Sequence, residues 1–372
     1  MGKRTLFGLA ALAVSFALVP YDVPAASADP PGKGKKFTFM TRNLYLGADL
    51  ADAVEAIATG EDPLVIASKV GQVWADVQHT DFATRAKALA DEIRDEKPDL
   101  IGLQEAVVWR IGAYDPATPA TTVAYDFVEI LLDALGKKGH HYEVVAISEG
   151  FDAEFTGIVS YDPFTLGDIR LTDREVILAR KGHGLKLSNV QEGHFVNVLP
   201  IPLPPSGYFL ANRGWASVDC KTGNEKFRFV TTHLEADVPY FRELQAAELI
   251  AAGGPCDTTL PVVLVGDFNS DGDGGDSEAA YDIVMAAGFS DAWTQTHAYT
   301  ADLYDSITWG HDDLLSDPFP FTNSPLERID FVLYRGNITA QATDRLGEEP
   351  ADRVKGLWPS DHAGIVSTLG IR

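Results

Sequence analysis

The chain has 372 residues and is strongly acidic, with 54 Asp and Glu residues against 30 Lys and Arg residues and a formal net charge of −24 at pH 7. This charge repels nucleic acids and other polyanions at long range unless cations intervene. The length allows one large α/β core or two domains, and we find no linker and no internal repeat that divides the chain.

Residues 1–28 have the pattern of a secretory signal peptide. Lys3 and Arg4 precede an apolar run from Thr5 to Pro20 that is too short to span a bilayer, and small residues at 26–28 suit a signal peptidase. Beyond this segment, no stretch reaches the roughly 20 continuous apolar residues of a membrane helix. We therefore expect a soluble protein that is secreted to the extracellular space.

The mature chain is expected to consist of a flexible N-terminus, 29–36, and a single domain, 37–372. Both cysteines, Cys220 and Cys256, would then lie in an oxidising compartment. Each is near the end of a predicted strand, so one disulfide is plausible, and the alternative is two unpaired, small apolar residues.

Along the chain, short apolar segments alternate with helical patterns. Segments of about four to eight residues, rich in β-branched and aromatic side chains, predict strands at 36–43, 99–105, 142–147, 157–162, 175–180, 227–234, 261–268, 329–334 and 364–369. Helical spacing of apolar residues predicts helices at 80–98, 125–135, 240–250 and 277–287. In an extra segment, 49–78, Asp62 and Pro63 are typical of an N-cap and a first helical position. The chain is therefore α/β, with sheets covered by helices.

The stretch LVGDFNSDGDGGDSE, Leu264–Glu278, fits the calcium-loop pattern of an EF-hand. An EF-hand loop is entered from a helix, whereas Asp267 follows a strand-like segment. Asp267 and Asn269 project from one face of a strand, so their polar ends can meet beyond its end. We interpret the stretch as an acidic loop after a strand. The alternative is an additional calcium ion held by Asp271, Asp273 and Glu278.

Several predicted strands end in polar residues that are costly to bury without partners. These residues are Asn43, Glu105, His233, Asp267 with Asn269, and Asp361 with His362. One such residue is usually a cap or a turn residue. Together they indicate one cleft at one edge of the sheets.

At these residues the chain resembles the endonuclease/exonuclease/phosphatase family. The matching stretches are TRNLYLG, LIGLQEA, VTTHLEA, VLVGDFNS, ERIDFVL and PSDHAGIV, in the family's order between residues 41 and 366. The combination of GDFN and SDH is the most specific feature. The resemblance implies a four-layered α/β sandwich, in which two mixed β-sheets pack face to face with helices outside. It also implies metal-dependent hydrolysis of a phosphoester.

The resemblance implies a divalent metal, Mg²⁺ or else Mn²⁺ or Ca²⁺, with Glu105 as its principal carboxylate ligand. Asn43 would lie beside Glu105 as a further ligand, and Asp361 would lie near the metal. Hard cations of this kind prefer carboxylate and amide oxygens. Tyr45 stands where the abasic-site branch often has a second carboxylate, so the chain departs from the DNA-repair branch.

The remaining matched residues are implied to act on the phosphoester. Asp267 and Asn269 resemble the pair that holds the attacking water and a phosphate oxygen. His362 corresponds to the histidine of SDH, with Asp330 as its carboxylate partner, and His233 would assist the leaving group. A histidine exchanges protons near neutral pH, and a partner Asp fixes its tautomer. Whether Asp267 or His362 takes the proton from water stays open. The other histidines considered, His79, His183, His194 and His311, match no motif and are expected at the surface or in structural roles.

The substrate depends on loops rather than on the fold. Residues 194–215 form an apolar, proline-rich excursion that could enter a lipid interface, as a hydrophobic hairpin does in sphingomyelinases of the family. The alternative is that it packs on its own domain. The expected wedge consists of Phe195, Val198, Leu199, Ile201, Leu203, Tyr208 and Phe209.

Three functions follow as hypotheses. The first is a secreted phosphodiesterase of the phospholipase C or sphingomyelinase type, acting as a monomer with peripheral membrane contact through 194–215. The second is a secreted deoxyribonuclease-like nuclease, and the third is a non-catalytic, calcium-dependent binding protein. The acidic charge and the lack of a Lys/Arg-rich patch favour phospholipid over nucleic acid. The complete catalytic set argues against binding alone.

Overall fold

The computed structural model describes residues 34–274, 279–298, 303–322 and 325–372. The expected signal peptide, 1–28, and most of the expected N-terminal segment, 29–33, lie outside these ranges. Gly34–Arg372 forms one compact unit. Its first strand already begins at Lys35, which pairs with Ile371. The end of the segment expected to be flexible is therefore held in a sheet.

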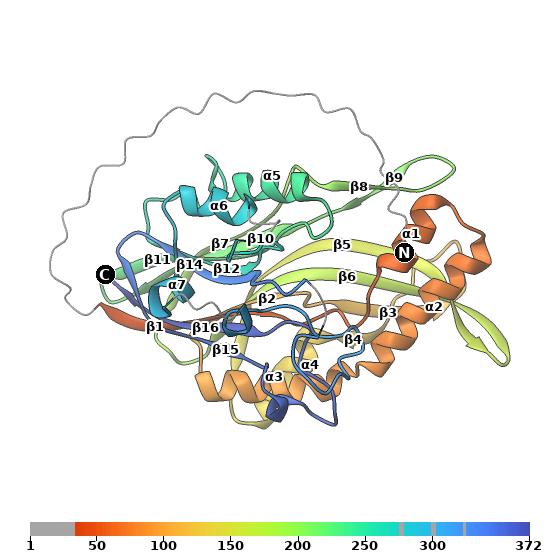
Figure 1. Ribbon diagram of the computed structural model, residues 1–372, viewed down its shortest axis with the longest axis horizontal. Coiled ribbons are helices and arrows are strands. Elements are labelled where there is room, and N and C mark those ends of the chain that lie inside the picture. The colour runs from red at the N-terminus through yellow and green to blue at the C-terminus, as the bar shows by residue number, and fades with distance from the viewer. Residues whose placement is uncertain (1–33, 275–278, 299–302, 323–324) are drawn as a thin grey trace. The chain divides into compact units, whose positions relative to one another are not determined.

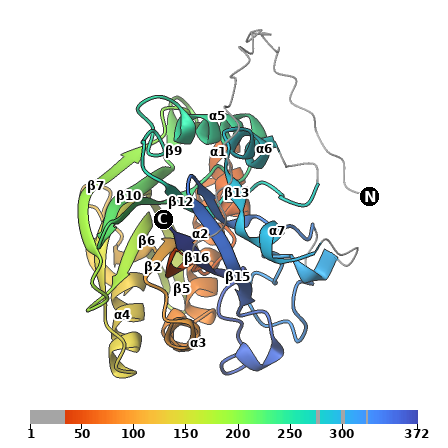
Figure 2. The same ribbon diagram turned by 90° about the vertical axis from the view of Figure 1, so that its left-hand side faces the viewer.

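The predicted fold class is confirmed, because two large mixed sheets lie face to face between helices (Figures 1 and 2). Among the described residues, the first sheet has eight strands, in the order β15-β16-β1-β2-β6-β3-β4 with β5 paired to β6. These strands are β1 (Lys35–Asn43), β2 (Leu100–Gln104), β3 (Val108–Ala113), β4 (Thr122–Asp126), β5 (Tyr142–Tyr161), β6 (Phe164–Arg180), β15 (Ile338–Leu346) and β16 (Gly364–Ile371).

The second sheet has six described strands, in the order β13-β14-β12-β11-β10-β7. They are β7 (Lys186–His194), β10 (Gly214–Thr222), β11 (Glu225–His233), β12 (Val262–Asp267), β13 (Ser290–Asp291) and β14 (Asp330–Arg335). A separate hairpin pairs β8 (Leu199–Pro202) with β9 (Tyr208–Ala211). The pairs β1/β2 and β11/β12 are parallel, so each pair ends at one edge of its sheet.

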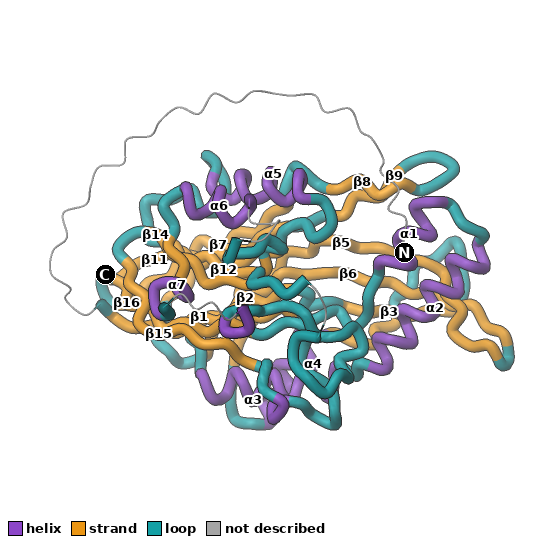
Figure 3. Tube along the Cα trace, in the orientation of Figure 1, coloured by secondary structure: helices purple, strands orange, loops and turns teal. Residues whose placement is uncertain are grey.

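Helices lie on the outer sides of the sheets, as Figure 3 shows by colour. On the outer face of the first sheet are α2 (Pro63–His79), α3 (Phe82–Glu96) and α4 (Phe127–Lys137), preceded by α1 (Ala51–Thr59). On the outer side of the second sheet are α5 (Pro239–Ile250) and α6 (Ala279–Ala286), and α7 (Ala292–Thr296) follows β13. Two short 3-10 helices span Leu303–Asp305 and Pro350–Asp352. In the part of the chain that the structure describes, no helix is both long and apolar enough to cross a membrane.

Three apolar cores separate the layers. Between the sheets, the ring of Phe39 stacks on that of Phe229 at 5.7 Å and meets Phe227 edge to face at 5.6 Å. Aromatic side chains of this size bury large apolar areas and hold the two sheets together. The strand ends that carry the polar residues are thereby held on a rigid scaffold.

Local sequence explains several element boundaries. Asp62 caps α2 by accepting the backbone N–H of Leu64, and Pro63 occupies the first turn, as predicted. The segments predicted as strands at 142–147 and 157–162 are strand up to Tyr161, but they belong to one continuous strand, β5, rather than to two. The pairing between β5 and β6 is irregular at three places, and each irregularity interrupts the alternation of apolar and polar side chains. The sequence of this one strand therefore reads as two separate strands.

The disulfide that the sequence made plausible is absent from the described residues, because Cys220 and Cys256 are both free, buried thiols. Cys220 belongs to the core between the sheets, whereas Cys256 belongs to the core beneath α5 and α6. The second sheet separates these two cores. Burial raises the pKa of the Cys256 thiol to about 12.

Candidate active site

The predicted polar residues meet where the two sheets end at the same side of the sandwich. The parallel pairing places Asn43 beside Gln104 and His233 beside Asp267, and antiparallel β14 begins with Asp330 opposite Asp267. A cleft of about 730 Å³ opens there. Of the eight predicted residues, six line the cleft: Glu105, His233, Asp267, Asn269, Asp361 and His362. Asn43 and Asp330 contact these residues from below.

His362 is oriented by Asp330. Its Nδ1 lies 2.8 Å from Asp330 Oδ2, and its Nε2 lies 3.7 Å from Asp267 Oδ2. Burial disfavours the imidazolium, but the carboxylates of Asp330, Asp361 and Asp267 outweigh that effect and raise the pKa of His362 to about 10. The ring is therefore a positively charged donor whose Nε2–H faces the cleft.

Asp267 stands at the centre of the polar residues. Its Oδ1 accepts the backbone N–H of Asn269 at 2.9 Å, and its Oδ2 accepts an amide N–H of Asn43 at 2.9 Å. His233 Nε2 lies 3.5 Å from the same Oδ2. Burial and the Asp330 charge raise the pKa of Asp267 to about 6. A carboxylate with this pKa can accept a proton near neutral pH.

The Asn43 amide contacts two acids and a backbone N–H, and its role as a metal ligand stays a prediction. Its Oδ1 accepts the backbone N–H of Tyr45 at 2.8 Å, which turns Nδ2 toward the acids. Nδ2 then donates to Glu105 Oε1 at 3.1 Å and to Asp267 Oδ2. Asn43 therefore holds the two carboxylates in place through its amide N–H groups.

Glu105 is a buried acid with further acids nearby, and its role as a metal ligand stays a prediction. Glu105 Oε2 accepts the backbone N–H of Leu46 at 2.6 Å. Burial, together with the nearby charges of Asp361 and Asp173, raises the pKa of Glu105 to about 7. Buried carboxylates at this density are stabilised by a cation, and hard cations prefer oxygen ligands. Within the described ranges, two groups have donor atoms within 4.8 Å of one another: Asp267, Asp330 and His362, and Asp173, Glu175 and His233.

Backbone strain accompanies the site. Tyr45, Glu105 and Asn269 adopt left-handed conformations with φ of 55°, 50° and 48°. Such conformations cost energy for residues other than glycine and cluster at functional sites. Here they turn the chain sharply at the ends of β1, β2 and β12.

The second histidine has partners that the sequence did not indicate as site residues. Arg213 Nη1 lies 3.0 Å from His233 Nδ1 and 3.2 Å from Asp173 Oδ2. Burial, Arg213 and His362 together hold the pKa of His233 well below its usual range, so this ring is neutral. Both side-chain oxygens of Glu175, buried in β6, have no hydrogen-bond partner in the described structure. The run Asp173-Arg174-Glu175, next to an otherwise apolar strand segment, was the feature of the sequence that could have indicated these site residues.

The segment 194–215 divides between core, cleft and surface. Phe195 is wrong as a wedge residue, because it is 4% exposed and packs in the core beneath α5. Leu199 and Ile201 of β8 line the cleft. Phe209 packs edge to face on Phe151 at 4.8 Å. Tyr208 and Leu210, by contrast, are exposed.

The acidic loop after Asn269 is held by an arginine. Arg328, which is buried, lies 2.9 Å from Asp273 and 2.6 Å from Asp291. Asp271 Oδ1 accepts the backbone N–H groups of Asp273 and Arg328. Both described residues of the alternative calcium set are thus engaged within the protein, and the third, Glu278, lies outside the described residues.

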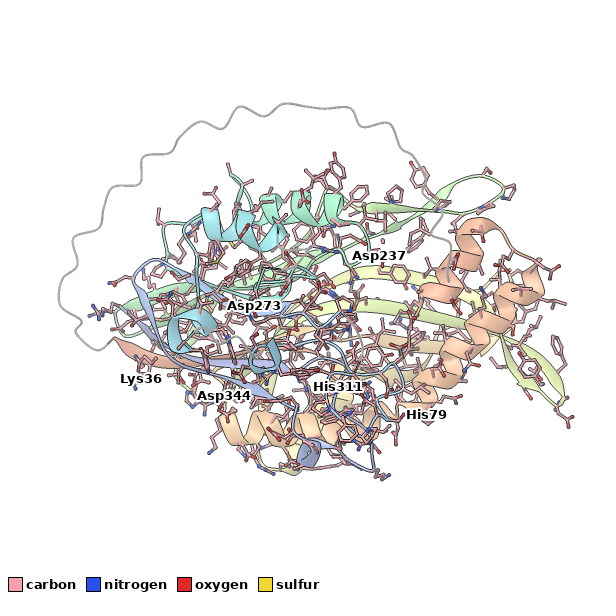
Figure 4. The ribbon with its side chains drawn as sticks, in the orientation of Figure 1. Lys36, His79, Asp237, Asp273, His311 and Asp344 are labelled. Atoms are coloured by element: carbon pink, nitrogen blue, oxygen red, sulfur yellow. The ribbon has the colours of Figure 1, made fainter. Side chains whose placement is uncertain are left out.

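His79, His183, His194 and His311, which match no motif, are not among the described residues that line the cleft. His79 is exposed at the end of α2, and His311 is buried. Both residues are labelled in Figure 4. The His311 ring stacks on Trp358 at 4.2 Å and on Phe321 at 4.7 Å. His183 lies 2.5 Å from Asp99, and His194 contacts the backbone oxygen of Glu149 at 2.5 Å.

Comparisons with known proteins agree with this architecture. The sequence model of the endonuclease/exonuclease/phosphatase family matches residues 73–362. No curated protein sequence matches the chain. Among solved structures, an endonuclease/exonuclease/phosphatase from Bacteroides vulgatus superimposes with a TM-score of 0.53 at 15% identity, covering 91% of this chain and 100% of that chain.

Two further structures are similar. A mannosyl-6-phosphatase from Bacteroides thetaiotaomicron has a TM-score of 0.52 at 17% identity, covering 90% of this chain and 99% of its own. TDP2 from D. rerio, in complex with a single-strand DNA product, has a TM-score of 0.50 at 17% identity, covering 90% and 98%. At these identities, the likeness establishes the fold.

Proposed function

Since the chain belongs to the endonuclease/exonuclease/phosphatase family, whose members hydrolyse phosphoesters, we propose that it is a divalent-metal-dependent phosphoester hydrolase. The observation that carries this proposal is the convergence of Glu105, Asp267 and the His362–Asp330 pair in one cleft. Hydrolysis needs a positioned water, a counter-charge for the phosphoryl oxygens and assistance to the leaving oxygen. The cleft contains side chains suited to each task.

The residues divide these tasks by their protonation. When bound at Glu105 and Asp361, a divalent cation supplies positive charge for the phosphoryl oxygens. Asp267 orients the water and accepts its proton, as its pKa of about 6 supports. His362, already protonated, donates from Nε2 to a phosphoryl oxygen. The water oxygen bonds to phosphorus as the bond to the leaving oxygen breaks, and the leaving oxygen takes a proton from solvent. Neutral His233, whose Nδ1 faces the Arg213 guanidinium, assists by offering an Nε2–H hydrogen bond to that oxygen.

The negative charge of the residues that line the cleft favours a phosphodiesterase of the phospholipase C or sphingomyelinase type over a nuclease. The lining includes the acids Asp49, Glu55, Glu235, Asp237 and Asp313, and Asp237 is labelled in Figure 4. Among the described lining residues, Arg213 is the single Lys or Arg. Phosphates flanking the cleaved bond in a nucleic acid would face these acids and be repelled. A substrate with one phosphate avoids this repulsion.

The proposal includes the setting in which the enzyme acts. Export follows from the signal-peptide pattern of 1–28, and Mg²⁺ is the expected metal, with Mn²⁺ or Ca²⁺ as alternatives. The exposed side chains of Tyr208 and Leu210 support peripheral contact of the hairpin with a membrane surface. We take the acting form to be a monomer.

Hydrolysis of bis(p-nitrophenyl) phosphate tests the reaction class. Activity is expected with added Mg²⁺ and is lost with chelator. The variants D267A and H362A should lower kcat by several orders of magnitude while the circular dichroism spectrum persists, whereas H79A, at an exposed histidine, serves as the control. Chelator-resistant turnover, or full activity of H362A, contradicts the proposal.

A second assay separates the substrates. Sphingomyelin or phosphatidylcholine liposomes and plasmid DNA are incubated with the enzyme under the same conditions, and the consumption of each is measured. Preferential hydrolysis of lipid is expected. Rapid cleavage of the plasmid with intact lipid would instead identify the nuclease alternative.

A further inference from the structure

The cleft has two chemically different sets of lining residues. Acids and histidines form one set. Apolar side chains from β8, α1, the first sheet and the loop after β1 form the other set, among them Ile201, Phe151 and Leu46. Polar substrates alone do not require such a wall, because each apolar side chain exposed there loses favourable burial. The apolar set is therefore a feature of the site that phosphoester chemistry does not explain.

A smaller apolar cavity adjoins the apolar side chains of the cleft. This cavity of about 60 Å³, beneath α1, shares Leu50, Val54, Phe151 and Leu171 with the cleft. Its inner end is lined by Trp109, Val70 and Ile169, which belong to the core between the first sheet and its helices. We call the apolar lining residues of the cleft together with this cavity the apolar arm.

Apart from Leu46, these apolar side chains of the arm come from segments outside the family-matching stretches. Val54 and Ile57 lie on one face of α1, because residues three to four apart on a helix share a face, and the N-cap residue Leu50 precedes them. On the opposite wall stand Leu199 and Ile201 of the hairpin. The ends of these walls approach closely, since a Cβ at Gly60 would lie 2.9 Å from Pro204. Figure 1 shows α1 beside β8, β9 and β5.

We propose that the apolar arm takes up one linear hydrocarbon chain of the substrate, so that the enzyme acts on a single-phosphate amphiphile whose chain is drawn out of its aggregate into the protein. This inference rests on the proposed function and narrows its substrate class. The lining of the inner cavity is entirely apolar and provides no hydrogen-bond partner for a base, a sugar or a charged head group. A methylene chain needs none.

Charge at the mouth supports the same occupant. Two acids flank the entrance to the apolar arm. Asp49 lies just before α1, and Glu55 lies on α1. A second phosphate placed there would be repelled, whereas an uncharged chain leading away from the reacting phosphate is not. The apolar arm and the acidic rim therefore select for one phosphate with an apolar substituent.

Binding of n-alkyldimethylphosphine oxides tests the inference without catalysis. These probes carry a neutral phosphoryl oxygen, one alkyl chain and no phosphoester bond. Calorimetry below the critical micelle concentration, with butyl, hexyl, octyl and decyl chains, should show affinity rising by about three- to fourfold per methylene until the apolar arm is full. Equal affinity for all chain lengths would overturn the inference.

Matched variants locate the effect. Val54→Trp fills the apolar arm and should abolish the dependence on chain length, whereas Val65→Trp, the same change at an exposed position of α2, should retain it. Ala153→Leu narrows only the inner cavity and should end the rise at a shorter chain. Circular dichroism establishes that each variant is folded. An unchanged chain-length dependence in folded Val54→Trp and Ala153→Leu contradicts the inference.

Hydrolysis of methyl p-nitrophenyl phosphate by the wild-type protein with Mg²⁺ tests the proposed function separately. Turnover of this ester together with length-independent binding would retain the function and discard the apolar arm. No turnover together with length-dependent binding would discard the proposed function and retain the binding of an alkyl chain in the apolar arm.

Discussion

Asp330 Oδ2 lies 2.8 Å from His362 Nδ1, and this contact joins the first strand residue of β14 in the second sheet to the turn that precedes β16 in the first sheet. His362 also donates its backbone N–H to Ser360 Oγ, which in turn donates to the backbone oxygen of Asn43. The catalytic ring is therefore held by both sheets, and its orientation follows from the packing of the sandwich.

Replacing Asp330 by Asn tests this relationship. D330N keeps the shape of the side chain but removes the charge that stabilises the imidazolium. We expect kcat for bis(p-nitrophenyl) phosphate to fall by about 10²–10⁴-fold. The double variant D330N/H362A should be hardly slower than H362A, because the two residues act as a unit. Multiplicative losses in the double variant would show that Asp330 acts independently of the ring.

Metal binding should stabilise the protein more at high pH than at low pH. The pKa values of Glu105 and Asp267 are raised to about 7 and about 6, so the stability that these groups contribute is present at low pH and is lost as the pH rises through those values. Above pH 7 both carboxylates are ionised and a cation relieves their repulsion, whereas at pH 5 protons compete with it. We expect Mg²⁺ to raise Tm at pH 8 and to have little effect at pH 5.

The variant E105Q provides the control for this shift. It removes the buried charge, so in chelator at pH 8 it should be more stable than the wild type by about 1–3 kcal/mol. It should also lose most of the Mg²⁺ effect. An equal rise in Tm for wild type and E105Q would place the bound cation elsewhere.

Strand ends were predictable because their residues combine two signals. An apolar run followed by Asp267 or Glu105 defines both the strand and the side of the sheet at which the acid emerges. Once the fold class is known, the strand ends are expected to meet at one edge of the sheets, and the fold class was predicted correctly. The orientation of the Asn43 amide was not predictable, because the backbone N–H of Tyr45 and two acids from other strands determine it.

Residues in the middle of strands were harder to assign. Asp173 and Glu175 of β6 alternate with neighbours as they would on a solvated face, but tertiary packing buries that face against Arg213. Irregular pairing in β5 likewise has no local sequence signal. The cysteines are separated by a sheet, which neither their spacing nor the compartment reveals.

Arg213 should be important for stability as well as for catalysis. Its guanidinium lies between the buried carboxylate of Asp173 and His233, and burial raises the pKa of Asp173 despite the opposing effect of Arg213. R213M leaves that acid and Glu175 without their cation. We expect a loss of about 3–5 kcal/mol in the free energy of unfolding at pH 8, measured in urea.

The variant R213M/D173N/E175Q tests the cause of that loss. Neutralising both acids should restore most of the stability of R213M, because no buried charge is left unpaired. Activity should stay low, since His233 loses its partner. A triple variant as unstable as R213M would attribute the loss to packing of the guanidinium rather than to charge.

His311 should make the fold sensitive to acid. Its ring is stacked between Trp358 and Phe321, and burial, followed by the charges of Arg42 and His362, lowers its pKa to about 3. The unfolded chain has the ordinary histidine pKa near 6.5 and therefore binds more protons between pH 6.5 and pH 3, so the free energy of unfolding decreases as the pH falls through this range. At pH 4.5 the loss due to this ring is about 2.5 kcal/mol.

The variant H311F isolates this contribution. Phenylalanine keeps the stacking but loses the Nδ1 acceptor of the Phe321 backbone N–H, so at pH 7 H311F should be less stable than the wild type by about 1 kcal/mol. At pH 4.5 the order should reverse, because the variant has no imidazole to protonate. Urea unfolding at both pH values measures the difference, and H79F, at an exposed histidine, controls for the substitution itself. A stability difference between H311F and wild type that is the same at both pH values would show that His311 is protonated in the folded state as readily as in the unfolded chain.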